Sequence, residues 1–167
     1  MTSRSAGITL VEVLLSVAIT TILVGSLVSF AIVSATSRAK AEAITEVEQQ
    51  AAFVEQFLNR TIREADSVTS PLAGSSASSL SLAMPAGVPS PVIFTLVNDT
   101  LQVVEGSSMA EQLHSNQVQM SNLTFYNATV GAGAGSVQYR FTLTATNPTG
   151  RNEFSYTRTY EGAGSLR

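Results

Sequence analysis

The sequence predicts an α+β fold in which one long N-terminal helix packs against a C-terminal antiparallel β-sheet. Three observations support this. Residues 7–35 are almost entirely apolar, and Glu12 is their one ionisable side chain. Residues 36–66 turn polar but keep a helical apolar period, and from Leu80 the period changes to two. A helix followed by consecutive alternating strands is typical of the α+β class.

The apolar run at 7–35 is longer than the roughly 20 residues needed to span a bilayer. Because backbone groups in lipid must bond among themselves, the run should be helical. Its serine and threonine side chains can be satisfied by backbone carbonyls. A carboxylate at Glu12 costs about 2–3 kcal/mol or more in such a segment unless it is paired. We therefore expect Glu12 to have a partner.

These N-terminal residues resemble the class III signal of type IV pilins and pseudopilins. The resemblance rests on a short leader with Arg4, the run GITLVE at 7–12, and the long apolar helix that follows. In that family a membrane peptidase cuts after the glycine and methylates the new N-terminus. The resemblance implies a leader at 1–7, cleavage after Gly7, and an N-methylated N-terminus at Ile8, where the family more often has Phe.

By the same resemblance, Glu12 is the fifth residue of the mature chain and an assembly residue. Four residues of helix rise about 6 Å. A neighbouring subunit shifted axially by that distance would place the ammonium of its Ile8 beside this Glu12. The pair would offset the desolvation of both charges and set the stagger between subunits.

Two other interpretations stay open. A secretory signal peptide would be cut after Val33-Ser34-Ala35, although the apolar core here is about twice the usual 7–15 residues. A plain single-pass anchor would leave Glu12 as an unexplained cost. Arg4 precedes the span, and Arg38 and Lys40 follow it, so the positive charges do not favour an internal N-terminus. A head outside the membrane is therefore an implication of the family resemblance.

The helix is expected to continue past the membrane, from about residue 8 to about 66. Residues 8–35 would be the transmembrane or filament-core part, and residues 36–66 an amphipathic continuation. Phe53 and Phe57 are expected to widen its apolar stripe as packing residues. Gly25 is the candidate flexible point of the apolar part. The stripe consists of Ile44, Val47, Ala51, Val54, Leu58 and Ile62, and the residues that mostly fall off it are Glu42, Glu46, Glu48, Glu55 and Glu64.

Residues 67–167 are expected to form a β-rich head. Residues 66–79 are predicted to be a loop by their Pro, Gly and Ser content, and residues 91–106 a hairpin turning at Asn98-Asp99. Further strands are predicted at 116–130, 137–146 and 153–160, with turns at 131–136 and 147–150. In the first of these strands the alternation breaks at Ser121-Asn122, and the expected inward residues are Val118, Met120, Leu123 and Phe125.

Composition excludes several classes of function. The net charge is −3, or −4 without the leader that contains Arg4, so no nucleic-acid footprint is indicated. There is no cysteine, hence neither a disulfide nor a thiolate metal site. His114 lies in a polar stretch without a second His, and is predicted to be a surface loop residue. Glu105 with Glu111, and Glu64 with Asp66, are expected to be solvated. The chain is predicted not to be an enzyme, with no catalytic residues, cofactor or metal.

The sequence therefore predicts a filament subunit of a type IV pilus or a type II secretion-like system, most similar to minor pilins and pseudopilins. The implied partners are the prepilin peptidase, other pilin or pseudopilin subunits, the membrane assembly platform, and lipid before assembly. The implied location is the cytoplasmic (inner) membrane and, after assembly, a cell-surface filament. The alternative function is a single-pass, membrane-anchored extracytoplasmic binding or adhesion domain that does not polymerise.

Overall fold

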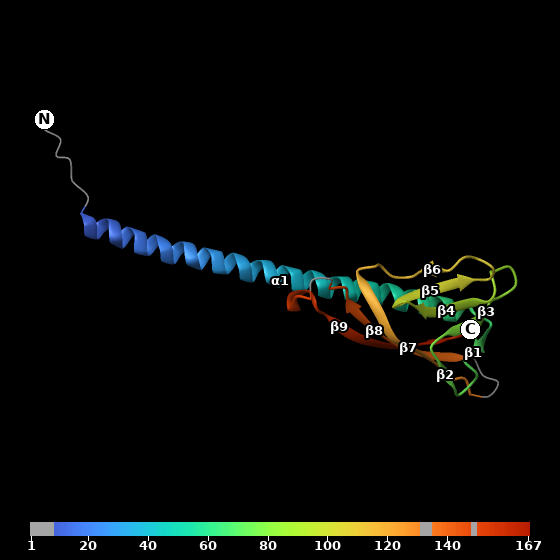
Figure 1. Ribbon diagram of the computed structural model, residues 1–167. Helices are drawn as coiled ribbons and strands as arrows, with labels where there is room; N and C mark the ends of the chain where they lie inside the picture. The colour runs from blue at the N-terminus through green and yellow to red at the C-terminus, as the bar shows by residue number, and fades with distance from the viewer. Residues whose placement is uncertain (1–8, 131–134, 148–149) are drawn as a thin grey trace. The chain divides into compact units, whose positions relative to one another are not determined.

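The computed structural model describes residues 9–130, 135–147 and 150–167 (Figure 1). The chain divides into two compact units, one up to Ala39 and one from Lys40 onward. The predicted leader at 1–7 and Ile8 lie outside the described residues. The class expected from the sequence is confirmed: a long helix is followed by antiparallel β-sheets that pack on it.

The first unit consists of the N-terminal part of helix α1, which runs from Leu10 to Glu64. Every residue from 9 to 33 is exposed. Hydroxyl groups in this part donate to backbone carbonyls of the preceding turn, for example Thr20 to Ser16 at 2.7 Å and Ser29 to Gly25 at 3.0 Å. The expected self-satisfaction of the polar side chains is therefore confirmed, and α1 continues without a break through Gly25.

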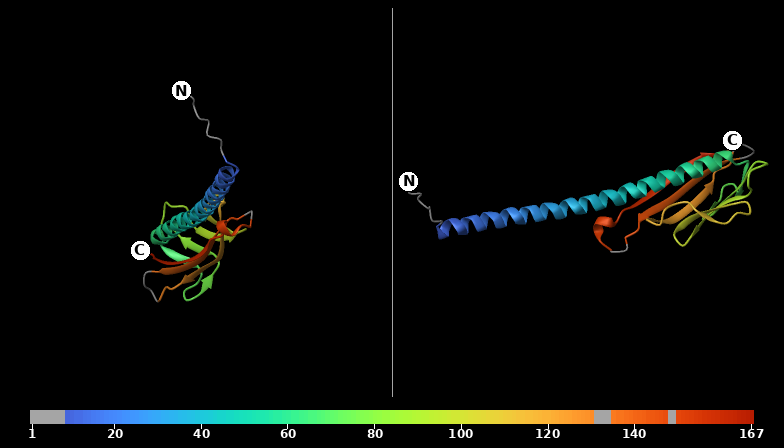
Figure 2. Two further views of the ribbon diagram at one scale, coloured as in Figure 1. Left: turned by 90° about the vertical axis from the view of Figure 1, so that its left-hand side faces the viewer. Right: turned by 90° about the horizontal axis from the view of Figure 1, so that it is seen from above.

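In the second unit, residues 40–64 of α1 lie against both sheets (Figure 2). The predicted apolar stripe is confirmed, with Ile44 half-buried at its start and the others fully buried: Val47, Ala51, Val54, Leu58 and Ile62. Phe57 packs edge-on against Phe94, with ring centroids 6.1 Å apart. Phe53 lies beside Phe57, with ring centroids 6.4 Å apart, but stays 51% exposed, so it packs at the edge of the stripe and outside the core.

Two antiparallel sheets replace the single sheet expected from the sequence. The first has the order β1-β3-β4-β5-β6 and the second β2-β7-β8-β9. The strands of the first sheet are β1 (Ser67–Ser70), β3 (Leu80–Ala83), β4 (Val92–Val97), β5 (Thr100–Glu105) and β6 (Glu111–Gln112). Those of the second are β2 (Ser76–Ala77), β7 (Val118–Asn127), β8 (Ser136–Ala145) and β9 (Thr157–Ser165).

The segment predicted to be a loop at 66–79 contains two of these strands. β1 pairs with β3, and β2 pairs with β7. Both are short edge strands made largely of Ser, Thr and Ala, so they carry no apolar alternation that a sequence pattern could detect. The composition of this segment therefore gave no sign of its backbone pairing.

The predicted hairpin is confirmed as β4 and β5. Val97 faces Thr100, and the two residues between them, Asn98 and Asp99, have φ values of 50° and 60°. Two consecutive residues with positive φ are what the two-residue hairpin turn requires, and Asn and Asp tolerate that conformation.

The irregularity predicted in the next strand is also confirmed. The register of β7 against β8 shifts between Ser121 and Thr124, and Asn122 has a φ of 53°. An extra residue at such a bulge restores the inward direction of the following side chains. The four predicted inward residues, Val118, Met120, Leu123 and Phe125, are accordingly all buried.

The last strand differs from the prediction at both ends. Residues 152–154 form a short 3₁₀ helix (η1, Asn152–Phe154), and β9 extends to Ser165 rather than ending at Tyr160. Its second half contains Gly162 and Gly164, which give no apolar signal. A Cβ at Gly164 would lie 2.9 Å from Cγ2 of Ile62, and one at Gly162 would lie 2.4 Å from the ring of Tyr139. The missing side chains let β9 approach α1 and the side chains of β8 closely.

Candidate functional site

Two of the three predicted site residues, Gly7 and Ile8, lie outside the described residues. The processing step assigned to them therefore stays a prediction. The third, Glu12, is in the first turn of α1, and its side chain is exposed. No ion pair to Glu12 is found within the described ranges, so its predicted pairing with the N-terminus of a neighbour also stays a prediction.

Thr9 caps the helix on which Glu12 lies. The backbone N–H of Glu12 donates to Oγ1 of Thr9 at 3.3 Å and to its carbonyl at 3.1 Å. Thr9-Leu10-Val11-Glu12 matches the capping-box pattern, a signal that the sequence interpretation missed. A carboxylate in the first turn also interacts favourably with the helix dipole. The hydrogen bonds to Thr9 are made by the backbone of position 12, and the Glu12 side chain contributes locally through the helix dipole.

The part of α1 that precedes Lys40 is long and apolar enough to cross a membrane, and none of its best span is covered by the rest of the chain. Its large apolar side chains are exposed on all sides of the helix; Leu10 is 79% exposed and Phe30 73%. Apolar surface of this extent needs lipid or other protein to cover it. No charged group other than Glu12 interrupts it before Arg38.

In the head, the prediction that His114 is a surface residue is wrong. Its side chain is only 5% exposed. Nε2 accepts a hydrogen bond from the backbone N–H of Leu101 at 3.0 Å, and Nδ1 lies 3.0 Å from the carbonyl of Ser115. An imidazole that accepts at Nε2 carries its proton on Nδ1, so it donates to Ser115. The imidazole of His114 therefore links β5 to the segment that follows β6, and it takes the place of a backbone hydrogen bond between strands.

Two glutamates predicted to be off the apolar stripe also have structural partners. The hydroxyl of Ser115 donates to Oε1 of Glu46 at 2.8 Å, and Tyr156 donates to Oε1 of Glu48 at 3.0 Å. Arg158 forms an ion pair with the same oxygen of Glu48. These contacts fasten the β6–β7 connection and β9 to α1, and sequence periodicity cannot distinguish them from solvated carboxylates.

The contacts around Glu48 shift several pKa values. Burial raises the pKa of Glu48, but the hydrogen bonds from Arg158 and Tyr156 outweigh that effect, and the net shift is downward. The hydrogen bond to Glu48, followed by an interaction with Tyr156, raises the pKa of Arg158. Burial, followed by the nearby charge of Glu48, raises the pKa of Tyr160 to about 12. The hydroxyl of Tyr160 is buried and has no hydrogen-bond partner among the residues that the structure describes.

The described residues contain no arrangement typical of a catalytic or metal site. Within them, no three His, Asp or Glu side chains are close enough to hold a metal ion. Glu105, Glu111, Glu64 and Asp66 are exposed, as predicted. The predicted turn at 131–136 falls mostly outside the described residues, as does part of the turn at 147–150.

Comparison of the chain with models of protein families, with curated proteins and with solved structures finds no match in any of the three. The interpretation of its function therefore depends on its own residues.

Proposed function

We propose that this chain is a prepilin-like, minor subunit of a type IV pilus or a related type II secretion filament, and is not an enzyme. The prepilin peptidase cuts after Gly7 and methylates Ile8. The mature protein then waits in the cytoplasmic membrane with its head outside. The assembly platform transfers it into a filament, where its apolar helix leaves lipid for a bundle of helices from other subunits.

The observation that carries the proposal is the uncovered apolar part of α1 with one carboxylate in its first turn. Every residue from 9 to 33 is exposed, and Glu12 is their only ionisable side chain. Lipid or a bundle of similar helices satisfies the apolar surface equally well. A bundle of staggered helices also brings an ammonium group to Glu12, and in lipid alone that carboxylate stays costly.

A single-pass anchor for an extracytoplasmic binding or adhesion domain is the second candidate. It is favoured by the position of Glu12 in the first turn of α1, where the helix dipole stabilises a carboxylate without any second subunit. In this candidate the helix never leaves the membrane and position 12 needs no ammonium partner. A secreted domain cleaved after Ala35 is the third.

The mass of the N-terminal peptide from protein recovered from its native cell separates the three candidates. A peptide that begins with N-methylated Ile8 supports processing as a prepilin. An intact Met1 favours the anchor, and a peptide beginning at Thr36 favours the secreted domain. Recovery of the protein in sheared extracellular filaments then tests polymerisation, which the anchor does not undergo.

Glu12→Ala tests the assembly role. We expect cleavage after Gly7 to be unchanged, because the peptidase acts before subunits meet, and incorporation into sheared filaments to be lost. Glu42→Ala, a change at another exposed glutamate of α1, is the matched control and should leave incorporation intact. Normal incorporation of the Glu12 variant would contradict the assembly role.

A further inference from the structure

A groove of about 780 Å³ lies beside the C-terminal end of α1. Its lining combines guanidinium groups with apolar side chains from the end of β3 and the loop that follows it. The arginines are Arg60, Arg63 and Arg167, and the apolar residues are Met84, Pro85 and Val88. Val88 is 47% exposed, so the apolar part of the groove is open to solvent.

The arginines of this groove are not neutralised by ion pairs. The chain has 9 lysines and arginines in all, and three of them line this one groove. Glu64 and Asp66 also line it, but within the described part of the chain neither lies within ion-pair distance of an arginine. The guanidinium of Arg60 instead lies 5.1 Å from the centre of the Phe57 ring. The side chains of the groove thus leave an excess of positive charge.

A buried acceptor in the groove wall is also unsatisfied. Asn59 donates through Nδ2 to the hydroxyl oxygen of Tyr139 at 2.8 Å, but its Oδ1 has no partner among the described residues. A buried acceptor without a donor costs about 1–3 kcal/mol.

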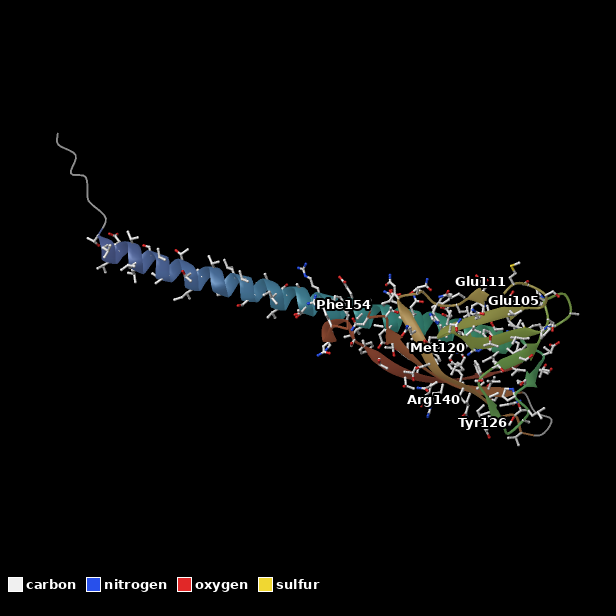
Figure 3. All side chains as sticks on the ribbon, in the orientation of Figure 1. Glu105, Glu111, Met120, Tyr126, Arg140 and Phe154 are labelled. Carbon is white, nitrogen blue, oxygen red and sulfur yellow. The ribbon has the colours of Figure 1, made fainter. Side chains whose placement is uncertain are left out.

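The same head carries a segment with complementary properties. The connection between β5 and β6 is flanked by Glu105 and Glu111, which lie together at one end of the first sheet (Figure 3). Both carboxylates are exposed, and within the described ranges neither forms an ion pair. Between them Met109 is 94% exposed, the most exposed large apolar side chain of the head. An unbranched, exposed thioether between two carboxylates is suited to an apolar groove edged by arginines.

Within one copy this segment is held by backbone hydrogen bonds at both ends. The N–H of Gly106 donates to the carbonyl of Pro91 at 2.8 Å, and Glu111 pairs with Val103 across β5 and β6. Met109 remains exposed under these restraints, so within one copy it fills no groove and is available to a second copy.

We propose that the arginine groove receives the β5–β6 connection of a second copy of this chain. Met109 lies against Met84 and Val88 of the receiving copy, and Glu105 and Glu111 pair with its arginines. A contact of this size is weak on its own. It becomes effective where copies are concentrated, as in one membrane or one filament. The inference goes beyond the proposed function and does not require cleavage after Gly7.

Disulfide cross-linking tests the contact directly, because the chain has no cysteine of its own. Full-length Val88→Cys and Met109→Cys proteins, carrying different tags, are reconstituted together in liposomes and oxidised. We expect the mixed dimer to form faster than in a matched pair of Ala163→Cys with Met109→Cys. Ala163 is exposed on β9, away from the groove lining. Equal rates in the two pairs would overturn the proposal.

Charge reversal supplies a second readout that a misfolded variant cannot imitate. Arg60→Glu with Arg63→Glu in the Val88→Cys protein should slow cross-linking about tenfold, through lost steering and ion pairing. Glu105→Arg with Glu111→Arg in the Met109→Cys protein should do the same. The two reversed proteins mixed together should recover most of the original rate. Failure to recover it, with both variants folded, would also overturn the proposal. Neither result depends on the mass of the N-terminal peptide.

Discussion

Gly164 of β9 sets how closely the second sheet approaches α1, and Gly164→Ala is the sharpest test of that packing. The added Cβ would lie 2.9 Å from Cγ2 of Ile62, closer than real Cβ atoms approach, and 3.1 Å from its Cβ, closer than most of them do. Ile62 is fully buried, so it cannot move aside. The backbone itself is not strained by alanine, because Gly164 is not among the glycines with positive φ.

The expected change in the free energy of unfolding of Gly164→Ala is the difference between two opposing effects. Overpacking a filled core by one methyl group costs about 1–3 kcal/mol. Replacing glycine by alanine restricts the unfolded chain and returns about 0.4–1 kcal/mol. The net loss should be about 1–2 kcal/mol, or a Tm about 4–8 °C lower for a head of this size.

The assay is thermal unfolding of the full chain in detergent micelles, followed by the tyrosine circular dichroism signal. The chain has no tryptophan, and its 4 tyrosines all lie in the head, so the signal reports on that unit alone. Ala163→Ser, an exposed neighbour on the same strand, is the control and should change stability by less than about 0.5 kcal/mol.

A double-mutant cycle with Ile62→Ala shows whether the clash is the cause. Ile62→Ala alone should cost about 2–5 kcal/mol. Because it removes Cγ2, the methyl group of Gly164→Ala then has room, and the double variant should be more stable than the sum of the two losses by about 1 kcal/mol. Strict additivity, or an unchanged Tm for Gly164→Ala, would refute the reasoning.

Three further substitutions test contacts within the head. His114→Phe removes the acceptor of the buried Leu101 N–H and should cost about 1–3 kcal/mol, measured by urea unfolding; an unchanged midpoint would contradict the structural role of the imidazole. Folding lowers the pKa of the Glu48 carboxyl below its ordinary value of 4.5. The stabilisation of the folded state by this carboxylate is therefore present above pH 4.5 and is lost as the pH falls below that value. Glu48→Gln should therefore flatten the acid limb of a Tm-against-pH curve, and an unaltered limb would exclude Glu48 as its cause. The pKa of Tyr160 is raised to about 12 and burial also raises that of Tyr139, so the Tm should fall as the pH rises above about 10. Tyr160→Phe should make that fall smaller, and an undiminished fall in the variant would assign it to other groups.

The sequence predicted the parts of the fold that are carried by periodicity and turn chemistry. The stripe of α1 follows from apolar residues three and four apart, the hairpin from Asn98-Asp99, and the bulge from the break at Ser121-Asn122. Each of these is a local signal, because the residues that determine the structure lie within a few positions of one another.

The parts that were missed depend on contacts between residues far apart in the chain. β1 and β2 become strands because their backbones hydrogen-bond to the outer edges of β3 and β7. His114 is buried because its imidazole accepts a hydrogen bond from the N–H of Leu101. Gly162 and Gly164 extend β9 because α1 and Tyr139 fill the space where side chains would lie. None of these partners is adjacent in sequence, and a polar or glycine-rich segment alone gives no sign of them.

Two physical roles are compatible with Glu12: helix capping and pairing with an ammonium group. At the fourth position of the capping-box pattern its side chain suits the start of α1, and as a carboxylate in an apolar helix it favours an ammonium partner. The two roles differ in what they require of the side chain. Capping and the helix dipole are largely local, so Glu12→Gln keeps most of the hydrogen-bonding capacity and should leave α1 formed. Pairing with an ammonium requires the negative charge, which glutamine lacks. A Glu12→Gln protein that is cleaved and folded but absent from filaments would therefore assign the residue to assembly, whereas normal incorporation would leave the cap as its function.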